Sequence, residues 1–239
     1  MATKIEWTEE TWNPITGCTK YSAGCEHCYA ATFARRLQAM GNNRYKNGFK
    51  VTVHRDLFSK PIEWTTPKMI FVNSMSDLFH EDVSDEDILE IFNTMNKASQ
   101  HTFQVLTKRA DRVEQLSPKI KWTDNIWMGV SIENKTALPR CEVLKKTGAK
   151  IKFISAEPLL ESISEIDLTG IDWLIVGGES GAKSRQLEEK WVIELRDLAQ
   201  KAQIPFFFKQ WGGFNKKANG SELQGKHYKE YPKTIRKDK

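Results

Sequence analysis

The chain has 239 residues, of which 39% are hydrophobic, and it contains eight Trp and twelve Phe. This is enough sequence for one substantial domain, and a single α/β barrel commonly has about this length. No stretch approaches the run of about 20 apolar residues that a membrane-spanning helix needs, which excludes an integral membrane protein of that kind. Few cysteines and no secretory signal lead us to expect a soluble protein of the reducing cytoplasm.

The net charge of +5 is concentrated at the C-terminal end. Residues 215–239 carry eight Lys or Arg against three acids, so the rest of the chain is formally neutral. We expect one domain over residues 1–214, followed by a basic C-terminal tail over residues 215–239. Such a tail is able to reach a phosphate backbone, and it equally suits a solvated terminus that aids solubility.

The first eleven residues alternate Ile5 and Trp7 with charged residues, which predicts a short edge strand or a lead-in to the loop that follows. The following loop, residues 18–28, holds three of the four cysteines: Cys18, Cys25 and Cys28. Cys25 and Cys28 have the spacing that lets two thiolates face one ion, and glycines give the loop the freedom to bring Cys18 back. The three thiols therefore indicate a metal or cluster site.

Three thiolates leave one coordination position for another group, because iron-sulfur clusters and structural zinc usually take four ligands. A structural zinc completed by His27 or His54 is the alternative. A disulfide is disfavoured, since one of three clustered thiols would be left over. The fourth cysteine, Cys141, lies on the apolar face of a predicted helix and is expected to be a buried core residue.

A helix is predicted directly after Cys28, with Ala30, Phe33, Ala34 and Leu37 on its buried face. Cys28 then stands at a helix N-terminus, where the backbone N–H groups favour thiolate charge. A second helix is predicted from Ser84, which opens a capping-box-like segment with acids in the first turn.

Apolar runs alternate with helical patterns along the rest of the chain, which is typical of a parallel sheet covered by helices. With the N-terminal segment they make eight candidate strands, and we predict a complete or partial (β/α) barrel. The runs are Val51–Val53, Met69–Val72, Phe103–Leu106, Ile126–Ile132, Ile151–Ile154, Trp173–Val176 and Pro205–Phe208.

Polar residues follow these runs, and in such folds the carboxyl ends of the strands converge on one mouth. A buried mouth of this kind must bind a polar ligand or satisfy itself internally. Each residue also suits a local role such as helix capping, but the repetition at consecutive strand ends favours a site. The predicted ligand-binding residues are Asn73, Ser74, Asp77, Lys108, Glu133, Glu157, Glu179 and Lys209. His80, in the loop after one strand end, is expected to be a surface histidine.

Several motifs over about residues 12–213 resemble the phage-associated three-Cys-motif family of radical-SAM-like iron-sulfur proteins. They are C-x6-C-x2-C from Cys18, N-S-M-S-D-L-F-H (73–80), L-T-K-R (106–109), G-V-S-I-E-N (129–134), S-A-E-P-L-L (155–160), I-V-G-G-E-S-G (175–181) and F-F-F-K-Q-W-G (206–212).

The resemblance implies a [4Fe-4S] cluster on Cys18, Cys25 and Cys28, with S-adenosylmethionine on the fourth iron. It implies reductive cleavage of S-adenosylmethionine and hydrogen abstraction from a substrate, with Glu133 and Glu179 as candidates to bind the cofactor. It further implies an electron donor such as flavodoxin or ferredoxin and a three-Cys-motif partner protein. A nucleic-acid base or nucleotide is the expected substrate class. The alternatives are a zinc-stabilised module that binds nucleic acid or protein without turnover, and a cluster-bearing protein that binds S-adenosylmethionine without radical chemistry.

Overall fold

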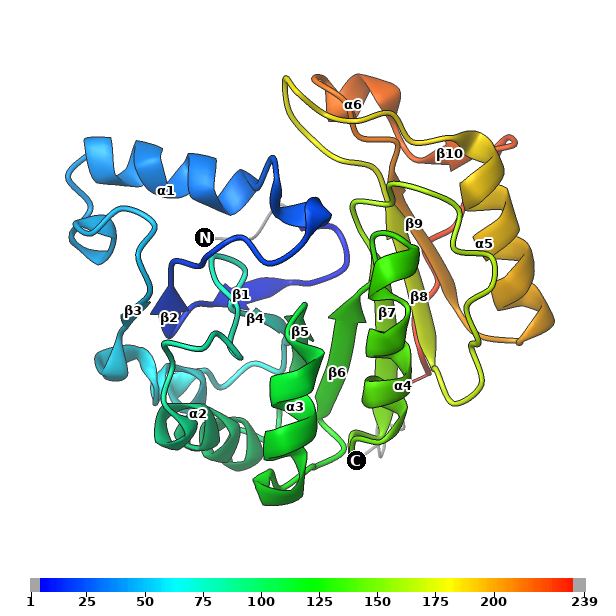
Figure 1. Cartoon of the computed structure of the whole chain (residues 1–239). Helices are drawn as coiled ribbons and strands as arrows, with labels where there is room; N and C mark the ends of the chain where they lie inside the picture. The colour runs from blue at the N-terminus through cyan, green and yellow to red at the C-terminus, as the bar shows by residue number, and fades with distance from the viewer. Residues whose placement is uncertain (1–4, 234–239) are drawn as a thin grey trace.

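The computed structural model describes residues 5–233, and its main element is a seven-stranded parallel sheet with the order β1-β4-β5-β6-β7-β8-β9. Its strands are β1 Glu10–Trp12, β4 Met69–Val72, β5 Thr102–Thr107, β6 Ile126–Ser131, β7 Ile151–Ala156, β8 Trp173–Gly177 and β9 Phe206–Gln210. Among the described residues the two edge strands, β1 and β9, do not pair with each other, so the curved sheet forms a partial barrel (Figure 1). The predicted α/β fold class is confirmed.

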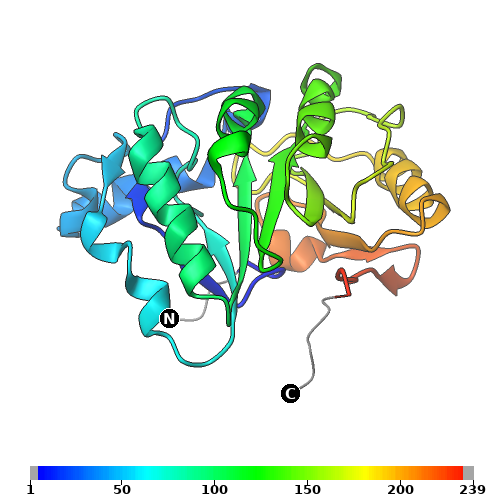
Figure 2. The ribbon, with the colours of Figure 1, turned by 90° about the horizontal axis from the view of Figure 1, so that it is seen from below.

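Four helices cover the convex side of this sheet, as the view from below shows (Figure 2). They are α2 Asp85–Lys97, α3 Ala110–Leu116, α4 Pro139–Lys145 and α5 Glu189–Lys201. Their apolar sides and alternate residues of the strands form the main core, in which Cys141 of α4 is buried as predicted. The predicted N-cap of α2 is also present, because the Ser84 hydroxyl accepts the backbone N–H of Asp87 at 3.1 Å.

Two predicted strands lie elsewhere. The run Val51–Val53 is no barrel strand: its residues in β3 (Thr52–Val53) pair antiparallel with β2 (Ile15–Thr16) outside the main sheet. The N-terminal edge strand is Glu10–Trp12, whereas Trp7 packs against the concave side of the sheet. A short apolar run identifies an extended segment but not the partner it pairs with, which is why the count of eight was too high.

Helix α1 (Tyr29–Ala39) begins directly after Cys28, as predicted. Ala30 and Ala34 are buried, but Phe33 is 49% exposed, so its predicted place on the buried face is wrong. The small side chains of Ala30 and Ala34 let α1 pack close to Tyr45 and Met75, whereas the larger Phe33 ring faces solvent.

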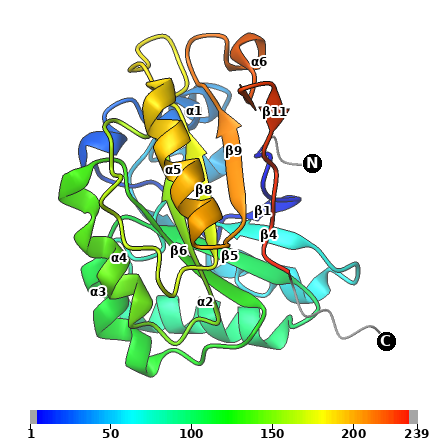
Figure 3. The same ribbon diagram turned by 90° about the vertical axis from the view of Figure 1, so that its right-hand side faces the viewer.

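The C-terminal segment folds back along β9. It contains α6 (Lys216–Asn219) and the hairpin of β10 (Glu222–Leu223) and β11 (Lys226–His227). Lys229 bridges to Phe207, and the Trp173 indole donates to the Glu230 carbonyl at 2.9 Å, on the side of the sheet away from α4 (Figure 3). A domain boundary at residue 214 stays a prediction, and residues 234–239 of the predicted tail lie outside the described residues. Within residues 5–233, no helix is long and apolar enough to cross a membrane.

Candidate functional site

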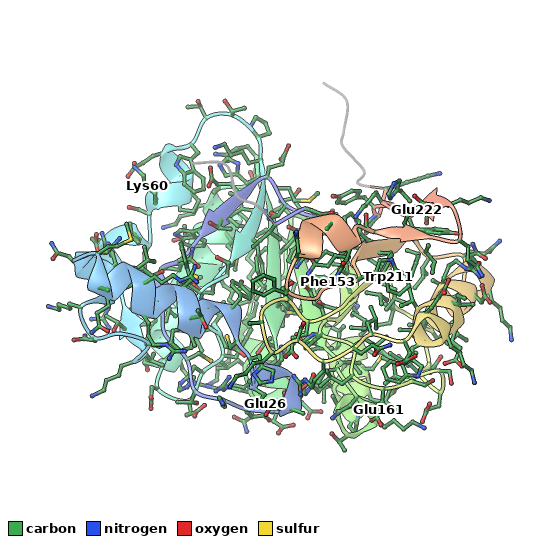
Figure 4. The ribbon with its side chains drawn as sticks, turned by 90° about the horizontal axis from the view of Figure 1, so that it is seen from above. Glu26, Lys60, Phe153, Glu161, Trp211 and Glu222 are labelled. Carbon is green, nitrogen blue, oxygen red and sulfur yellow. The ribbon has the colours of Figure 1, made fainter. Side chains whose placement is uncertain are left out.

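The concave side of the barrel has an aromatic floor and a polar upper layer. Strand residues alternate between the two faces, and the concave positions near the strand starts form one cluster. Its buried members are Trp7, Phe71, Trp127, Phe153, Trp173, Ile175 and Phe207. Above it, the same faces continue with Gly129, Ser131, Ser155 and Gly177. Figure 4, viewed from above, shows Phe153 between α1 and the C-terminal segment that carries Trp211 and Glu222.

The predicted polar residues continue this upper layer. Lys108 and Glu157 each follow the last residue of a strand, and Lys209 lies in β9. Glu157 and Lys209 form an ion pair across β8, where Gly177 lies between them. Lys108 lies near enough to Glu133 to lower the pKa of that carboxyl, together with Arg140 and Ser22, although burial opposes the shift. The fold therefore brings charged groups from β5, β6, β7 and β9 to one mouth.

Loop 18–28 lies over this mouth and carries three free thiols. Cys18, Cys25 and Cys28 are all partly exposed, and Cys28 occupies the N-cap position of α1, as predicted. Burial raises the pKa of the Cys18 thiol to about 11, with Asp77 adding to the rise and Arg109 opposing it. The Arg109 guanidinium lies 3.6 Å from Cys18 Sγ, so a cation is already in place for a thiolate.

Arg109 is the centre of a buried network under the loop. Its NH1 donates to Asp77 at 3.2 Å and its Nε to Glu81 at 2.9 Å, and only 5% of the residue is exposed. Asp77 also accepts the Thr107 hydroxyl at 2.6 Å and the backbone N–H of Lys108. Asp77 therefore fixes Arg109 rather than pointing into the mouth.

His80 belongs to the same network and is fully buried, so the predicted surface position is wrong. Its Nδ1 accepts the backbone N–H of Asp82 at 3.0 Å, and its Nε2 accepts the backbone N–H of Thr19 at 3.2 Å and lies 2.8 Å from the Thr19 hydroxyl. Burial and the nearby Arg109 lower the pKa of His80 and keep the ring neutral. The two acids that follow it in the sequence made this segment look solvated.

Glu133 anchors the middle of the loop. Its side chain is fully buried, accepts the Ser22 hydroxyl and pairs with Arg140 at 2.8 Å. A Cβ on Gly24 would come within 3.2 Å of the Glu133 side chain, so glycine permits this close approach. Tyr21 is held between two cations, with Arg109 and Arg140 at 4.9 and 5.5 Å from its ring centre.

Glu179 anchors the neighbouring part of the loop through Arg185. The Arg185 guanidinium makes two hydrogen bonds to Glu179 and donates to the Ala23 carbonyl at 3.0 Å. These bonds hold the pKa of Glu179 below its usual range although burial opposes them. Arg140, Arg185 and Ser22 were not predicted. Ser22 meets Glu133 across 111 residues of sequence, whereas Arg140 and Arg185 lie in polar segments that look solvated.

Asn73 and Ser74 follow β4 and support the start of the loop. Asn73 Oδ1 accepts the backbone N–H of Ile15 at 3.3 Å, and its buried Nδ2 has no partner among the described residues. The Ser74 hydroxyl donates to Asn13 at 3.2 Å, and its carbonyl accepts the Tyr29 hydroxyl at 2.5 Å. A buried amide without a partner at a strand end is compatible with a polar ligand or a bound water.

The donor set fits an iron-sulfur cluster in its chemistry, because three free thiols in one loop are soft ligands. Over residues 5–233 no three Cys, His, Asp or Glu side chains are already gathered as a metal site, so the sulfurs have to turn toward one another on loading. His54, one candidate fourth zinc ligand, is buried against the Thr16 hydroxyl at 2.9 Å. The role of each residue toward a cofactor stays a prediction.

Comparison with known proteins adds a family. A family model described as "Protein of unknown function (DUF5131)" matches residues 2–232. The chain belongs to this family. No curated protein matches it.

Two solved structures of spore photoproduct lyase are among the matches of the DUF5131 chain. One, with bound AdoMet and dinucleoside spore photoproduct, is 12% identical with a TM-score of 0.48 and is aligned over 81% of this chain and 60% of that chain. The other, a cysteine-to-serine mutant, is 13% identical with a TM-score of 0.49 over 85% and 63%. The chain thus spans less than two thirds of their length, and the partial barrel rests on its own strand order and register.

Proposed function

We propose that this protein is a radical-SAM-type enzyme in which Cys18, Cys25 and Cys28 hold a [4Fe-4S] cluster. The observation that carries the proposal is the position of a three-thiol loop over the polar mouth of a partial (β/α) barrel. The motif resemblance described above supports the same assignment. When bound, the cluster supplies the one-electron reductive cleavage of S-adenosylmethionine and the hydrogen abstraction from substrate that follows.

The chain's own residues provide placement and exclusion of water. Glu133, Glu179 and Asp77 are engaged by arginines, and through them they hold loop 18–28 in place. The groups that remain to bind a zwitterionic cofactor are the Glu157–Lys209 pair, Lys108 and the free amide of Asn73. A carboxylate beside an ammonium complements an amino group beside a carboxylate, and the aromatic floor closes the barrel below.

We propose a nucleic-acid base or nucleotide as the substrate, a three-Cys-motif partner protein that delivers it, and a flavodoxin- or ferredoxin-like protein that supplies the electron. The proposal for substrate rests on the family resemblance and on the cationic C-terminal segment. Co-purification from the native host tests the two protein partners, and their absence from the eluate would remove them from the proposal.

Anaerobic reconstitution tests the enzyme proposal. The reconstituted protein should be brown with absorbance near 400 nm, and reduction with S-adenosylmethionine should release 5′-deoxyadenosine and methionine. Replacing all three cysteines with alanine should abolish iron binding, whereas Cys141→Ala, in the core, should leave the iron content unchanged. A colourless protein with one zinc would instead establish the zinc-stabilised binding module, and iron with no 5′-deoxyadenosine would refute catalysis.

A further inference from the structure

The segment that follows the cysteine loop contains no acid. From His27 to Arg55 there is no Asp or Glu, while six Lys or Arg are present. Arg44 and Arg55 pair with Asp56 and Asp87. No ion pair within residues 5–233 engages the four remaining cations, which are all exposed: Arg35, Arg36, Lys46 and Lys50. The positive charge of this segment therefore remains available for a polyanion.

Helix α1 also exposes large apolar side chains that a solvated helix does not need. Tyr29 is 56% exposed, Phe33 49% and Met40 79%. At helical spacing these positions, the last of them the C-cap Met40, lie on one side of α1 together with Arg36, and the adjacent side, with Ala30 and Ala34, packs on Tyr45 and Met75. We call these four residues, Tyr29, Phe33, Arg36 and Met40, the α1 face.

The α1 face lies beside the mouth of the barrel. The Tyr29 hydroxyl bonds to the Ser74 carbonyl after β4, and Cys28 directly precedes the helix. In Figure 4 helix α1 lies on one side of Phe153 and the C-terminal segment lies on the other. Lys50 lines a hollow of about 610 Å³ whose other walls include Cys18 and Phe49. A chain lying along the basic segment therefore reaches the cysteine loop.

We propose that the α1 face and the cations around it bind a single-stranded polynucleotide and hold it over the site. The inference rests on the proposed function for its chemistry and narrows the substrate to a nucleotide within a strand. Exposed aromatic rings stack on unpaired bases, and basic side chains follow the phosphates. A duplex has its bases stacked internally, so it offers the rings no partner.

Fluorescence anisotropy with a labelled mixed-sequence 12-mer tests this inference, using the full chain at 50 to 200 mM salt. Single-stranded DNA or RNA should bind at least 10-fold more tightly than the 12-bp duplex. Phe33→Ser should weaken binding of the single strand by about 10-fold, because the stacking of one base on the Phe33 ring accounts for an affinity change of about this size. Arg36→Glu should weaken it and lower the salt slope by about 0.7 or more.

Lys190→Glu is the matched control, since Lys190 lies on α5 with its side chain 82% exposed, and its binding should equal that of the native chain. The variants lie on the surface, and equal melting temperatures will confirm that they fold. Absence of oligonucleotide binding, equal binding of duplex, or unchanged affinity in both α1 variants would overturn the inference. The inference would also be overturned if the native chain binds no oligonucleotide but forms a dimer that dissociates in the α1 variants.

The experiment separates this inference from the proposed function, because binding is measured without iron or S-adenosylmethionine. Iron content and 5′-deoxyadenosine release are measured on the native chain in parallel. Strand binding without a cluster would refute radical chemistry and keep the α1 face as a polynucleotide site. A functional cluster without strand binding would refute the α1 face as a polynucleotide site and keep the radical-SAM proposal.

Discussion

Replacement of Arg109 tests whether the cysteine loop is held by a buried ionic network. In Arg109→Met the Asp77 carboxylate, in a residue only 7% exposed, loses its cation, and removing one partner of a buried pair costs about 3–5 kcal/mol. Asp77 still accepts hydrogen bonds from the Thr107 hydroxyl at 2.6 Å and the backbone N–H of Phe79 at 3.0 Å, which favours a cost at the lower end of this range. We therefore expect a loss of about 3 kcal/mol in the free energy of unfolding.

Urea denaturation followed by tryptophan fluorescence measures this change, and the double variant Asp77→Asn/Arg109→Met measures the coupling. Because the Asn side chain no longer needs a cation, the double variant should be more stable than the sum of the single changes by about 1–2 kcal/mol. Lys190→Met, on the exposed side of α5, should stay within about 0.5 kcal/mol of the native chain. A loss below about 1 kcal/mol for Arg109→Met, or strict additivity, would refute the network.

Three further predictions follow from the same loop and its supports. Arg185→Met removes a charged hydrogen bond to the Ala23 carbonyl, so amide exchange in residues 20–28 should rise about 10-fold, while Arg196→Met, paired with its neighbour Asp197, should leave it unchanged. The pKa of His80 is lowered by burial, so the unfolded chain binds more protons, and stability should fall as pH drops through about 6.5 toward the folded pKa. His80→Gln should reduce the dependence of stability on pH. His54, whose pKa is also lowered by burial, should supply the remainder. An unchanged pH dependence in His80→Gln would contradict the role of His80. Gly178→Ala places a Cβ 2.1 Å from the Trp211 carbonyl oxygen and should cost about 2 kcal/mol or more in thermal unfolding, whereas Gly177→Ala, with its nearest contact at 3.4 Å, should cost clearly less.

Local sequence patterns predicted the elements and the side of the barrel on which the polar residues lie. The apolar runs from Met69 onward are strands, Ser84 caps α2, and Cys28 precedes α1, because each depends on neighbours within one or two turns. The pairing of strands and loops was less predictable. Val51–Val53 pairs with β2 rather than joining the barrel, since strand pairing depends on residues far along the chain.

The same limit applied to the site. Position at the carboxyl ends of the strands predicted that Lys108, Glu157 and Lys209 lie at the mouth, but it gave no sign that Glu133 and Glu179 are engaged by arginines. Glu133 meets Ser22 across 111 residues of sequence, and only the folded chain brings them together. Their expected contacts with a cofactor stay untested predictions.

The rings of Trp7, Phe153 and Trp173 close one end of the barrel, and the C-terminal segment adds Tyr231 beneath them. With this end closed, the mouth under loop 18–28 gives access to the polar layer. Under the proposed function, the small cofactor and the long strand both bind at this mouth, so the cofactor has to bind before the strand covers it. The products of cofactor cleavage then leave only after the strand has dissociated. Dissociation of the strand therefore comes before cofactor exchange in each turnover.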